Sequence, residues 1–78
     1  MEYTIYEKVI VIIANQFDVS EDSINESTDL RNDLGADSLD AVDLLMDIDD
    51  EFELDIPDEE IIYIRTIGDV VKYIEDHI

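Results

Sequence analysis

The run of residues 38–53 limits most narrowly how this chain can fold. It contains no glycine or proline, is rich in residues that favour helices, and repeats its apolar side chains at helical spacing. Asp37 or Ser38 can cap its N-terminus, and the acidic residues that follow suit the positive end of a helix dipole. The pattern therefore predicts a helix of about four turns.

A second helical pattern occupies residues 3–16. At the helical rotation of about 100° per residue, Ile5, Val9 and Ile12 share one stripe. Other apolar residues widen that stripe: Tyr6, Ile10, Ile13 and Phe17. Such a wide apolar arc predicts a first helix that is buried around much of its circumference.

Between these helices, residues 18–36 are polar and lack a periodic pattern. Isolated apolar residues are spaced through the segment: Val19, Ile24, Leu30 and Leu34. A loop of this length is uncommon in a compact domain unless it is functional or disordered, and the spaced apolar residues favour a loop pinned to the core. Gly35 ends the loop, where we expect a left-handed or tight turn.

The remaining residues predict two more helices. Pro57 breaks the chain, and residues 58–63 suit a short third helix. Thr66 and Asp69 form a capping-box pattern before a fourth helix that runs to the end. The predicted fold class is therefore all-α: a small four-helix bundle that forms a single domain over residues 1–78, with a long loop between helices one and two and a short third helix.

The charge of the chain is far from balanced. Asp and Glu number 23 against 4 Lys and Arg, so the formal net charge is -19 and the pI is near 4.1. Such a charge disfavours nucleic acid and anionic membranes as partners and favours basic protein surfaces. Because like charges repel, we expect a monomer whose melting temperature rises with added salt or Mg²⁺.

The chain contains no cysteine, which excludes disulfides, thiolate metal ligands and a thiol nucleophile of its own. The apolar run 9–14 is too short for a membrane segment, and no basic region precedes it. We therefore expect a complete, cytoplasmic chain. The acidic run 47–51 lacks the glycine and the alternating ligands of a calcium loop, so we expect no specific metal site.

The helix predicted over residues 38–53 carries two apolar stripes. One of them should face the core: Ala41, Leu44, Leu45, Ile48 and Phe52. Leu39, Val42 and Met46 lie roughly 100° to 160° away and should be largely exposed. Acidic residues surround this second stripe without any basic residue. That composition suits a docking surface for a basic partner with an apolar centre, although a solvated face with scattered apolar residues explains it too.

Ser38 could serve as a nucleophile, a helix cap or an attachment point. A catalytic serine needs a base within hydrogen-bond reach, and the single histidine, His77, stands at the end of the chain, where we expect fraying. Enzymatic use is therefore disfavoured, whereas capping is a common role for serine at such a position. As an attachment point, Ser38 would hold a phosphodiester at the positive end of the helix dipole, near free backbone N–H groups.

Residues 34–40, Leu-Gly-Ala-Asp-Ser-Leu-Asp, resemble the prosthetic-group attachment motif of the acyl carrier proteins of fatty acid synthesis. The similarity continues through four later segments in the order of the family: 42–46, 50–52, 56–60 and 66–69. It covers nearly the whole chain, and the length and acidity of the chain agree with it.

The resemblance implies a carrier, not an enzyme. Ser38 would be modified by a carrier-protein synthase, a phosphopantetheinyl transferase that uses coenzyme A. It would then bear a 4'-phosphopantetheine arm, whose thiol holds acyl chains as thioesters, partly sheltered between helices. Enzymes of fatty acid synthesis would dock through basic patches. The resemblance places their recognition surface on Asp37, Leu39, Asp40, Val42, Asp43, Met46, Asp50 and Glu51, with Ile56 at its edge.

The chain departs from the family pattern at a few positions. Apolar or aromatic residues replace usual charges at Ile10, Val11, Ile62 and Tyr63, and Asp47 replaces an often small residue. These differences suit altered partner choice, a tighter core or weak self-association. They leave open a carrier of a specialised pathway, such as polyketide or lipid A synthesis, and a non-carrier acidic adaptor that uses the same helix face.

Overall fold

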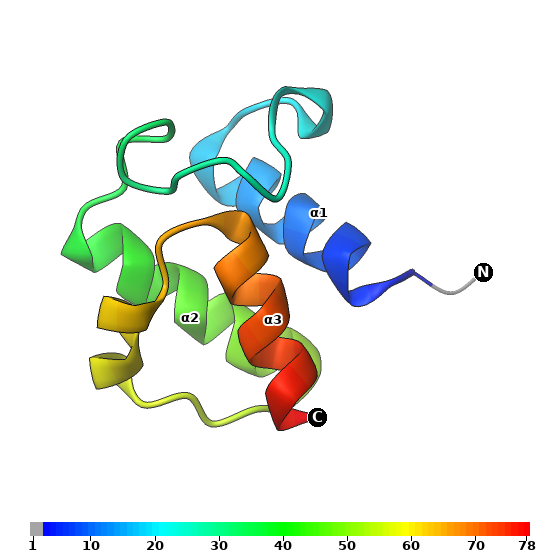
Figure 1. Ribbon diagram of the computed structural model, residues 1–78, viewed down its shortest axis with the longest axis vertical. Helices are drawn as coiled ribbons and strands as arrows, with labels where there is room; N and C mark the ends of the chain where they lie inside the picture. The colour runs from blue at the N-terminus through cyan, green and yellow to red at the C-terminus, as the bar shows by residue number, and fades with distance from the viewer. Residues whose placement is uncertain (1–2) are drawn as a thin grey trace.

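The computed structural model describes residues 3–78 and contains three α-helices and two short 3-10 helices. In chain order these are α1 (Ile5–Phe17), η1 (Glu21–Ser23), α2 (Ser38–Phe52), η2 (Asp58–Tyr63) and α3 (Ile67–His77). Figure 1 shows the α-helices packed together, with η2 beside α2 and the 18–36 loop across one end. The predicted all-α class is confirmed. Residues 1 and 2 of the predicted domain lie outside the described residues. Among the described residues, no helix is long and apolar enough to cross a membrane.

Capping boxes begin all three of the described α-helices. In α1, Thr4 Oγ1 accepts a hydrogen bond from the N–H of Glu7 at 3.1 Å, and Glu7 Oε1 accepts one from the N–H of Thr4 at 3.0 Å. Thr66 and Asp69 make the same exchange before α3, as predicted. Because Thr4 takes the cap position, α1 begins later than predicted and Tyr3 stays exposed.

One hydrophobic core joins the helices. Its most deeply buried side chains come from all three of them: Val9, Ile13, Leu44, Ile48, Ile67, Val70 and Ile74. The first helix is buried on most sides, as predicted, but its buried stripe is centred differently. Ile5 and Ile12 are only half-buried, whereas Ile10 and Ala14 are buried. The reason is that both α2 and α3 pack on α1, so the face between them is the one that is covered.

The long loop is pinned to this core, as predicted. Ile24 and Leu30 are buried, and Val19 and Leu34 are partly buried against the core. An isolated antiparallel bridge between Asp29 and Thr66 also ties the loop to the segment before α3. Its two hydrogen bonds run from Leu30 N–H to Arg65 O at 2.9 Å and from Ile67 N–H to Thr28 O at 3.0 Å. The loop is therefore a fixed wall of the domain.

Left-handed backbone ends the loop and two helices. Gly35 has a φ of 71°, as expected of a glycine at this turn. Asp18 and Glu53 have φ values of 54° and 56° and close α1 and α2. Their N–H groups donate to the carbonyls of Ala14 and Asp49, which satisfies acceptors in the last turn. The second helix thus ends one residue before the predicted end.

Candidate functional site

Ser38 is the first residue of α2, and it is exposed. Of the two residues that could cap this helix, Asp37 does so: its Oδ1 accepts from the N–H of Asp40 at 2.9 Å, and Asp40 Oδ2 accepts from the N–H of Asp37 at 3.2 Å. Among the side chains and backbone groups that the structure describes, the Ser38 hydroxyl and the N–H groups of Ser38 and Leu39 have no hydrogen-bond partner. The hydroxyl is thus open to modification beside two free backbone donors, an arrangement that favours an anion.

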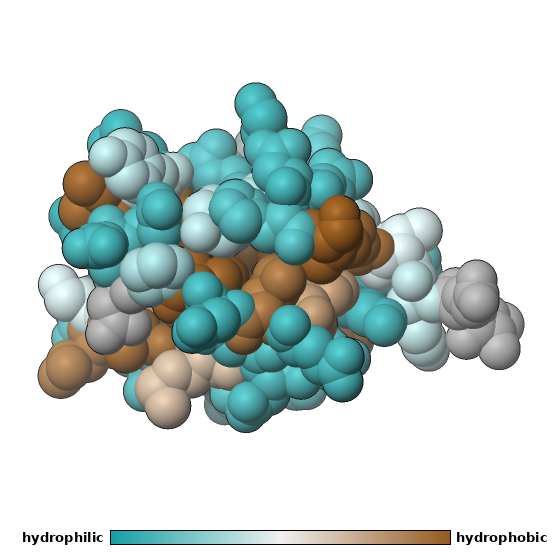
Figure 2. Space-filling model, turned by 90° about the horizontal axis from the view of Figure 1, so that it is seen from below, coloured by the Kyte–Doolittle hydropathy of each residue, from teal (hydrophilic) through white to brown (hydrophobic). Residues whose placement is uncertain are grey.

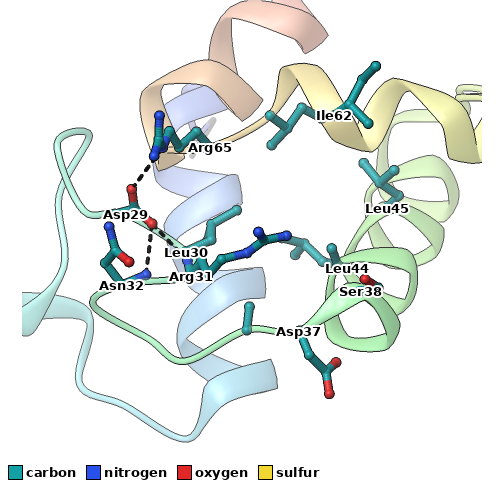
Figure 3. A pocket seen from close by; sticks show the side chains of 13 residues that line it. Asp29, Leu30, Arg31, Asn32, Asp37, Ser38, Leu44, Leu45, Ile62 and Arg65 are labelled. Carbon is teal, nitrogen blue, oxygen red and sulfur yellow. Dashed lines mark hydrogen bonds and ion pairs between the residues drawn. The ribbon is translucent and has the colours of Figure 1, made fainter.

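A cavity of about 420 Å³ opens beside Ser38, between the 18–36 loop, α2 and the chain around η2 (Figure 3). The buried residues that line it are apolar: Leu30, Ala36, Leu44 and Leu45. Its exposed lining is mostly polar and includes Arg31, Asn32, Asp37, Ser38 and Arg65. This division between an apolar interior and a polar opening suits a ligand with a polar head and an apolar tail.

Asp29 organises the loop wall of this cavity. Its Oδ1 accepts hydrogen bonds from the N–H groups of Arg31 and Asn32 at 2.9 Å and 2.8 Å, and its Oδ2 lies 3.4 Å from Arg65 Nε. The bond from Asn32 contributes most to holding the pKa of the Asp29 carboxyl below its usual value, and the Arg31 N–H and both guanidinium charges act in the same direction. Our sequence interpretation missed Asp29, although an aspartate just before a polar turn is the usual signal for such side-chain-to-backbone bonds.

The apolar part of the predicted docking face is present on α2. Leu39 and Met46 are 75% and 59% exposed, as predicted. Val42 is half-buried, so the large exposure predicted for it was wrong. On the helical wheel Val42 is the member of this stripe that lies nearest to Leu45 and the core stripe, which accounts for its partial burial.

The acidic residues predicted for this face differ in what they contact. The exposed ones are Asp37, Asp43, Asp50 and Glu51. Glu51 Oε2 lies 3.9 Å from Lys8 Nζ, in an exposed pair that contributes little to stability. Asp40 is half-buried, and its carboxylate is held in the capping box of α2. Its carboxylate therefore has a structural role besides any role in docking.

Ile56, which the resemblance had placed at the edge of the recognition surface, lies in the core. Its side chain is only 6% exposed, and its N–H donates to Asp49 Oδ1 at 3.1 Å. This hydrogen bond folds the chain after α2 back onto the helix and turns Ile56 inward. The exposed part of the predicted docking face therefore does not include the Ile56 side chain.

The departures from the family pattern separate into buried and exposed ones. Ile10 is buried in the core, whereas Val11 is half-buried and is not among the residues that pack against the core. Ile62 and Tyr63 are 78% and 70% exposed on η2. Figure 2 views the molecule from the end where the α2–η2 connection and the C-terminus lie, and it shows hydrophobic side chains between the hydrophilic ones that cover most of this face.

We expected fraying at His77, but the structure places this residue in α3. Its ring stacks on that of Tyr73 with the centroids 4.0 Å apart, and its Nδ1 lies 2.7 Å from the Tyr73 carbonyl oxygen. The imidazole is therefore engaged within its own helix and not with Ser38. In the described part of the chain, no group of His, Asp and Glu side chains is placed to hold a metal ion.

Comparison with known proteins agrees with this site. Residues 7–74 match the family model described as a phosphopantetheine attachment site. Over 76 residues the chain is 46% identical to an acyl carrier protein of Lactobacillus acidophilus, which covers 97% of this chain and 95% of that protein. An acyl carrier protein of Clostridium perfringens is also 46% identical, over 72 residues that cover 92% of this chain and 95% of that protein.

The match over residues 7–74 makes this small helical domain a carrier domain for a phosphopantetheine group, and the exposed serine at the start of α2 beside a cavity with an apolar interior is compatible with that class. The chain belongs to the acyl carrier protein family. Members of this family are carriers and not enzymes. The site fits the group, because the unengaged hydroxyl of Ser38, the free N–H groups beside it and the cavity could each hold a part of a phosphodiester with a long flexible arm.

Proposed function

We propose that Ser38 is the attachment point of a 4'-phosphopantetheine arm on which this protein carries acyl chains as thioesters during fatty acid biosynthesis in the cytoplasm. The observation that carries the proposal is the state of the Ser38 hydroxyl: it is exposed at the head of α2, and the capping that a serine there often performs is done by Asp37. No hydrogen bond among the described residues uses this hydroxyl, so we expect that it can be modified without loss of the helix.

Attachment would join the phosphorus of coenzyme A next to the pantetheine to Ser38 Oγ. The new O–P bond forms as the bond from that phosphorus to the bridging oxygen of the pyrophosphate breaks. Adenosine 3',5'-bisphosphate leaves, and the hydroxyl proton passes to a base of the carrier-protein synthase. The protein contributes the exposed hydroxyl and the N–H groups of Ser38 and Leu39, which stabilise the phosphate charge at the start of α2.

The arm supplies a terminal thiol, which the cysteine-free chain lacks and which forms the thioester. The residues of the protein then hold and shield the cargo. Buried Leu30, Leu44 and Leu45 offer apolar surface in the cavity, and exposed Ile62 extends that surface at its outer edge. An acyl chain that enters the cavity removes apolar area from water, which favours a sheltered state over an extended one.

The face of α2 suits the enzymes that exchange this cargo. Leu39 and Met46 form its apolar part, and Asp37, Asp43 and Asp50 add negative charge around them. Opposite charges on a basic partner would speed encounter, and the small apolar area would keep the complex weak and short-lived. We propose that the carrier-protein synthase and the enzymes of fatty acid synthesis bind here through basic patches, and that the carrier works as a monomer.

The experiment that tests Ser38 is loading of the apo protein with coenzyme A and a phosphopantetheinyl transferase. Intact mass should rise by one phosphopantetheine in the wild type and in Ser27→Ala, a control at another exposed serine, but not in Ser38→Ala. Because the chain has no cysteine, a thiol assay should rise from zero to one thiol per chain in the same two samples. Ser38→Ala should stay folded, since Asp37 still caps α2.

Two results would contradict the proposal. A mass gain in Ser38→Ala would move the attachment point elsewhere, and no gain in a folded wild type would leave the acidic adaptor as the function of this helix face. Loaded protein that is not a substrate for fatty acid synthesis enzymes would instead favour a carrier of a specialised pathway. The exposed Ile62 and Tyr63 are the observation on which that second assignment would rest.

A further inference from the structure

The four basic residues of this acidic chain are differently engaged. Lys8 pairs with Glu51, Arg65 pairs with Asp29, and Lys72 is exposed on α3. The guanidinium of Arg31 has no carboxylate within salt-bridge distance among the side chains that the structure describes. In a chain with a formal net charge of -19, an arginine side chain without such a partner needs a physical account.

Arg31 lines the same cavity as Ser38. Figure 3 shows its side chain extending from the 18–36 loop across the cavity toward α2, on the side where Leu44 and Ser38 lie. The backbone at its base is well fixed, because the Arg31 N–H donates to Asp29 Oδ1 at 2.9 Å and the next residue donates to the same oxygen. A fixed base and a side chain directed across the cavity place a positive charge among the residues that line the same cavity as Ser38.

The nearby carboxylates already have partners of their own. Asp37 Oδ1 accepts from the N–H of Asp40, Asp33 Oδ2 accepts from the N–H of Asp29, and Asp29 holds the backbone of the turn together with Arg65. The negative charges of these carboxylates favour a cation in this region. None of the three carboxylates lies within salt-bridge distance of the Arg31 guanidinium. The guanidinium thus stays available for an anion that arrives at Ser38.

We propose that Arg31 binds the phosphodiester formed on Ser38 and so holds the first atoms of the arm over the opening of the cavity. The proposal rests on Ser38 being the attachment point. A guanidinium offers several N–H donors in a planar fork that matches phosphate oxygens, and a charge-assisted bond of this kind is stronger than a neutral one. The phosphate would receive donors from two sides: the N–H groups of Ser38 and Leu39 from α2, and Arg31 from the loop.

This contact has a consequence for the direction of the arm. A phosphate held only at the start of α2 leaves the arm free to point into solvent. A second contact to the loop wall places the phosphate across the cavity opening, so the next atoms of the arm begin at the apolar interior lined by Leu30, Leu44 and Leu45. Arg31 therefore acts as a positioning residue for the cargo, through the phosphate.

The test uses NMR of the loaded full-length protein. The arm carries the single phosphorus atom of the molecule, so its ³¹P signal reports on the phosphodiester directly. We expect the ³¹P chemical shift of loaded Arg31→Gln to differ from that of the loaded wild type. The chemical shift of Lys72→Gln should equal the wild-type value, and that of Arg31→Lys should lie between the values of the wild type and Arg31→Gln. Lys72→Gln removes the same charge from an exposed site on α3 that does not line the cavity. High salt should move the wild-type signal toward that of Arg31→Gln.

A second readout needs no loaded variant. The sequence has two arginines, so ¹⁵N labelling gives two Nε–H signals, and Arg31→Gln in the apo protein identifies the Arg31 signal. On loading of the wild type, this signal should shift and exchange with solvent several-fold more slowly, while the Arg65 signal should change little because the Arg65 guanidinium already pairs with Asp29.

The outcomes separate the two proposals. If the wild type takes up no arm, the attachment proposal fails. If it loads normally but the Arg31 Nε–H signal does not respond, and the ³¹P signals of Arg31→Gln and Lys72→Gln agree, then the role of Arg31 is overturned while Ser38 stands.

Discussion

Gln16 Nε2 donates a hydrogen bond to the backbone carbonyl of Asp40 at 2.9 Å, which joins the last turn of α1 to the first turn of α2. The other end of the same amide, Gln16 Oε1, is buried without a hydrogen-bond partner among the described residues. The turn that presents Ser38 is thus held by a half-satisfied amide from another helix. Burying the unpartnered Oε1 costs free energy, which offsets part of the stability that the Nε2 hydrogen bond contributes.

Two substitutions of Gln16 should separate the contributions of the Nε2 donor and the Oε1 acceptor to the free energy of unfolding. Gln16→Met removes the donor and the unpartnered oxygen together, so we expect a loss of less than about 1 kcal/mol in the free energy of unfolding. Gln16→Glu keeps the shape but sets a carboxylate against the Asp40 carbonyl. It should cost about 1–3 kcal/mol at neutral pH, because two acceptors then face each other. Urea unfolding measures both, and equal losses would contradict the assignment of the amide.

Local chemistry accounts for what could be predicted from the sequence. The caps of Thr66 and Asp37, the left-handed Gly35 and the core stripe of α2 each depend on residues within a few positions of one another. The place of Ser38 at the start of α2 was recognisable for the same reason, whereas its role as an attachment point was inferred from the family resemblance of residues 34–40 and stays a prediction.

Contacts between distant segments account for the rest. Ile56 is turned inward by a hydrogen bond to Asp49, and Arg65 reaches Asp29 across the fold, neither of which a periodic pattern reports. The cavity is likewise bounded by three segments that meet only in the folded chain. The exposure of Val42 was overestimated for a different reason: it lies nearest to the core stripe on the helical wheel, and its prediction gave that position too little weight.

The two glycines should respond differently to substitution. Gly35 has a φ of 71° and open space where a Cβ would lie, so Gly35→Ala should lose about 1–2 kcal/mol from backbone strain alone, and Gly35→Asn should lose less. A Cβ on Gly68 would lie 3.0 Å from the carbonyl oxygen of Glu26, which also accepts the Gly68 N–H at 2.8 Å. Gly68→Ala should therefore displace the loop and speed hydrogen exchange at residue 68. Unchanged exchange there would show that the loop does not have to move.

Reversing a charge or removing an apolar side chain on the exposed face of α2 should weaken transfer without unfolding the helix. Asp43 and Met46 are exposed, so Asp43→Lys or Met46→Asp should leave the circular dichroism spectrum unchanged. Each should lower kcat/KM of the phosphopantetheinyl transferase by about tenfold, which corresponds to about 1.4 kcal/mol. Glu21→Lys on η1 makes the same charge change as Asp43→Lys outside α2 and serves as the control for that variant. Kinetics like those of the control would remove this face from the docking surface.

Salt should stabilise the fold. With a formal net charge of -19, screening of repulsion over a distance of about 10 Å at 0.1 M salt should raise the melting temperature. Mg²⁺ should exceed Na⁺ at matched ionic strength, since a divalent ion gains more from crowded carboxylates. Thermal scans across a salt series provide the measurement. A flat series would mean that self-repulsion is a minor part of the free energy of folding.

Asp29 should contribute to stability at neutral pH and lose that contribution in acid. Its pKa in the folded state lies below the ordinary value of 3.8, chiefly because of the hydrogen bond from the Asn32 N–H. A lowered pKa means that the folded state favours the carboxylate, so the contribution is complete above 3.8 and is lost as the pH falls through the folded pKa. The difference in unfolding free energy between wild type and Asp29→Asn should shrink over that range. An NMR titration in which the Asp29 carboxyl has an ordinary pKa would contradict this account.

Asp18 and Glu53 close α1 and α2 in a conformation that favours glycine or asparagine, and they place a carboxylate at the negative end of each helix dipole. Neither helix has a basic residue in its last turn to compensate. Two sites where a neutral residue would suit the folded state better thus hold acids. Negative charge is therefore present even at positions where it destabilises the fold. This distribution is expected when the long-range electrostatic field that attracts an approaching enzyme matters more than a small gain in thermal stability.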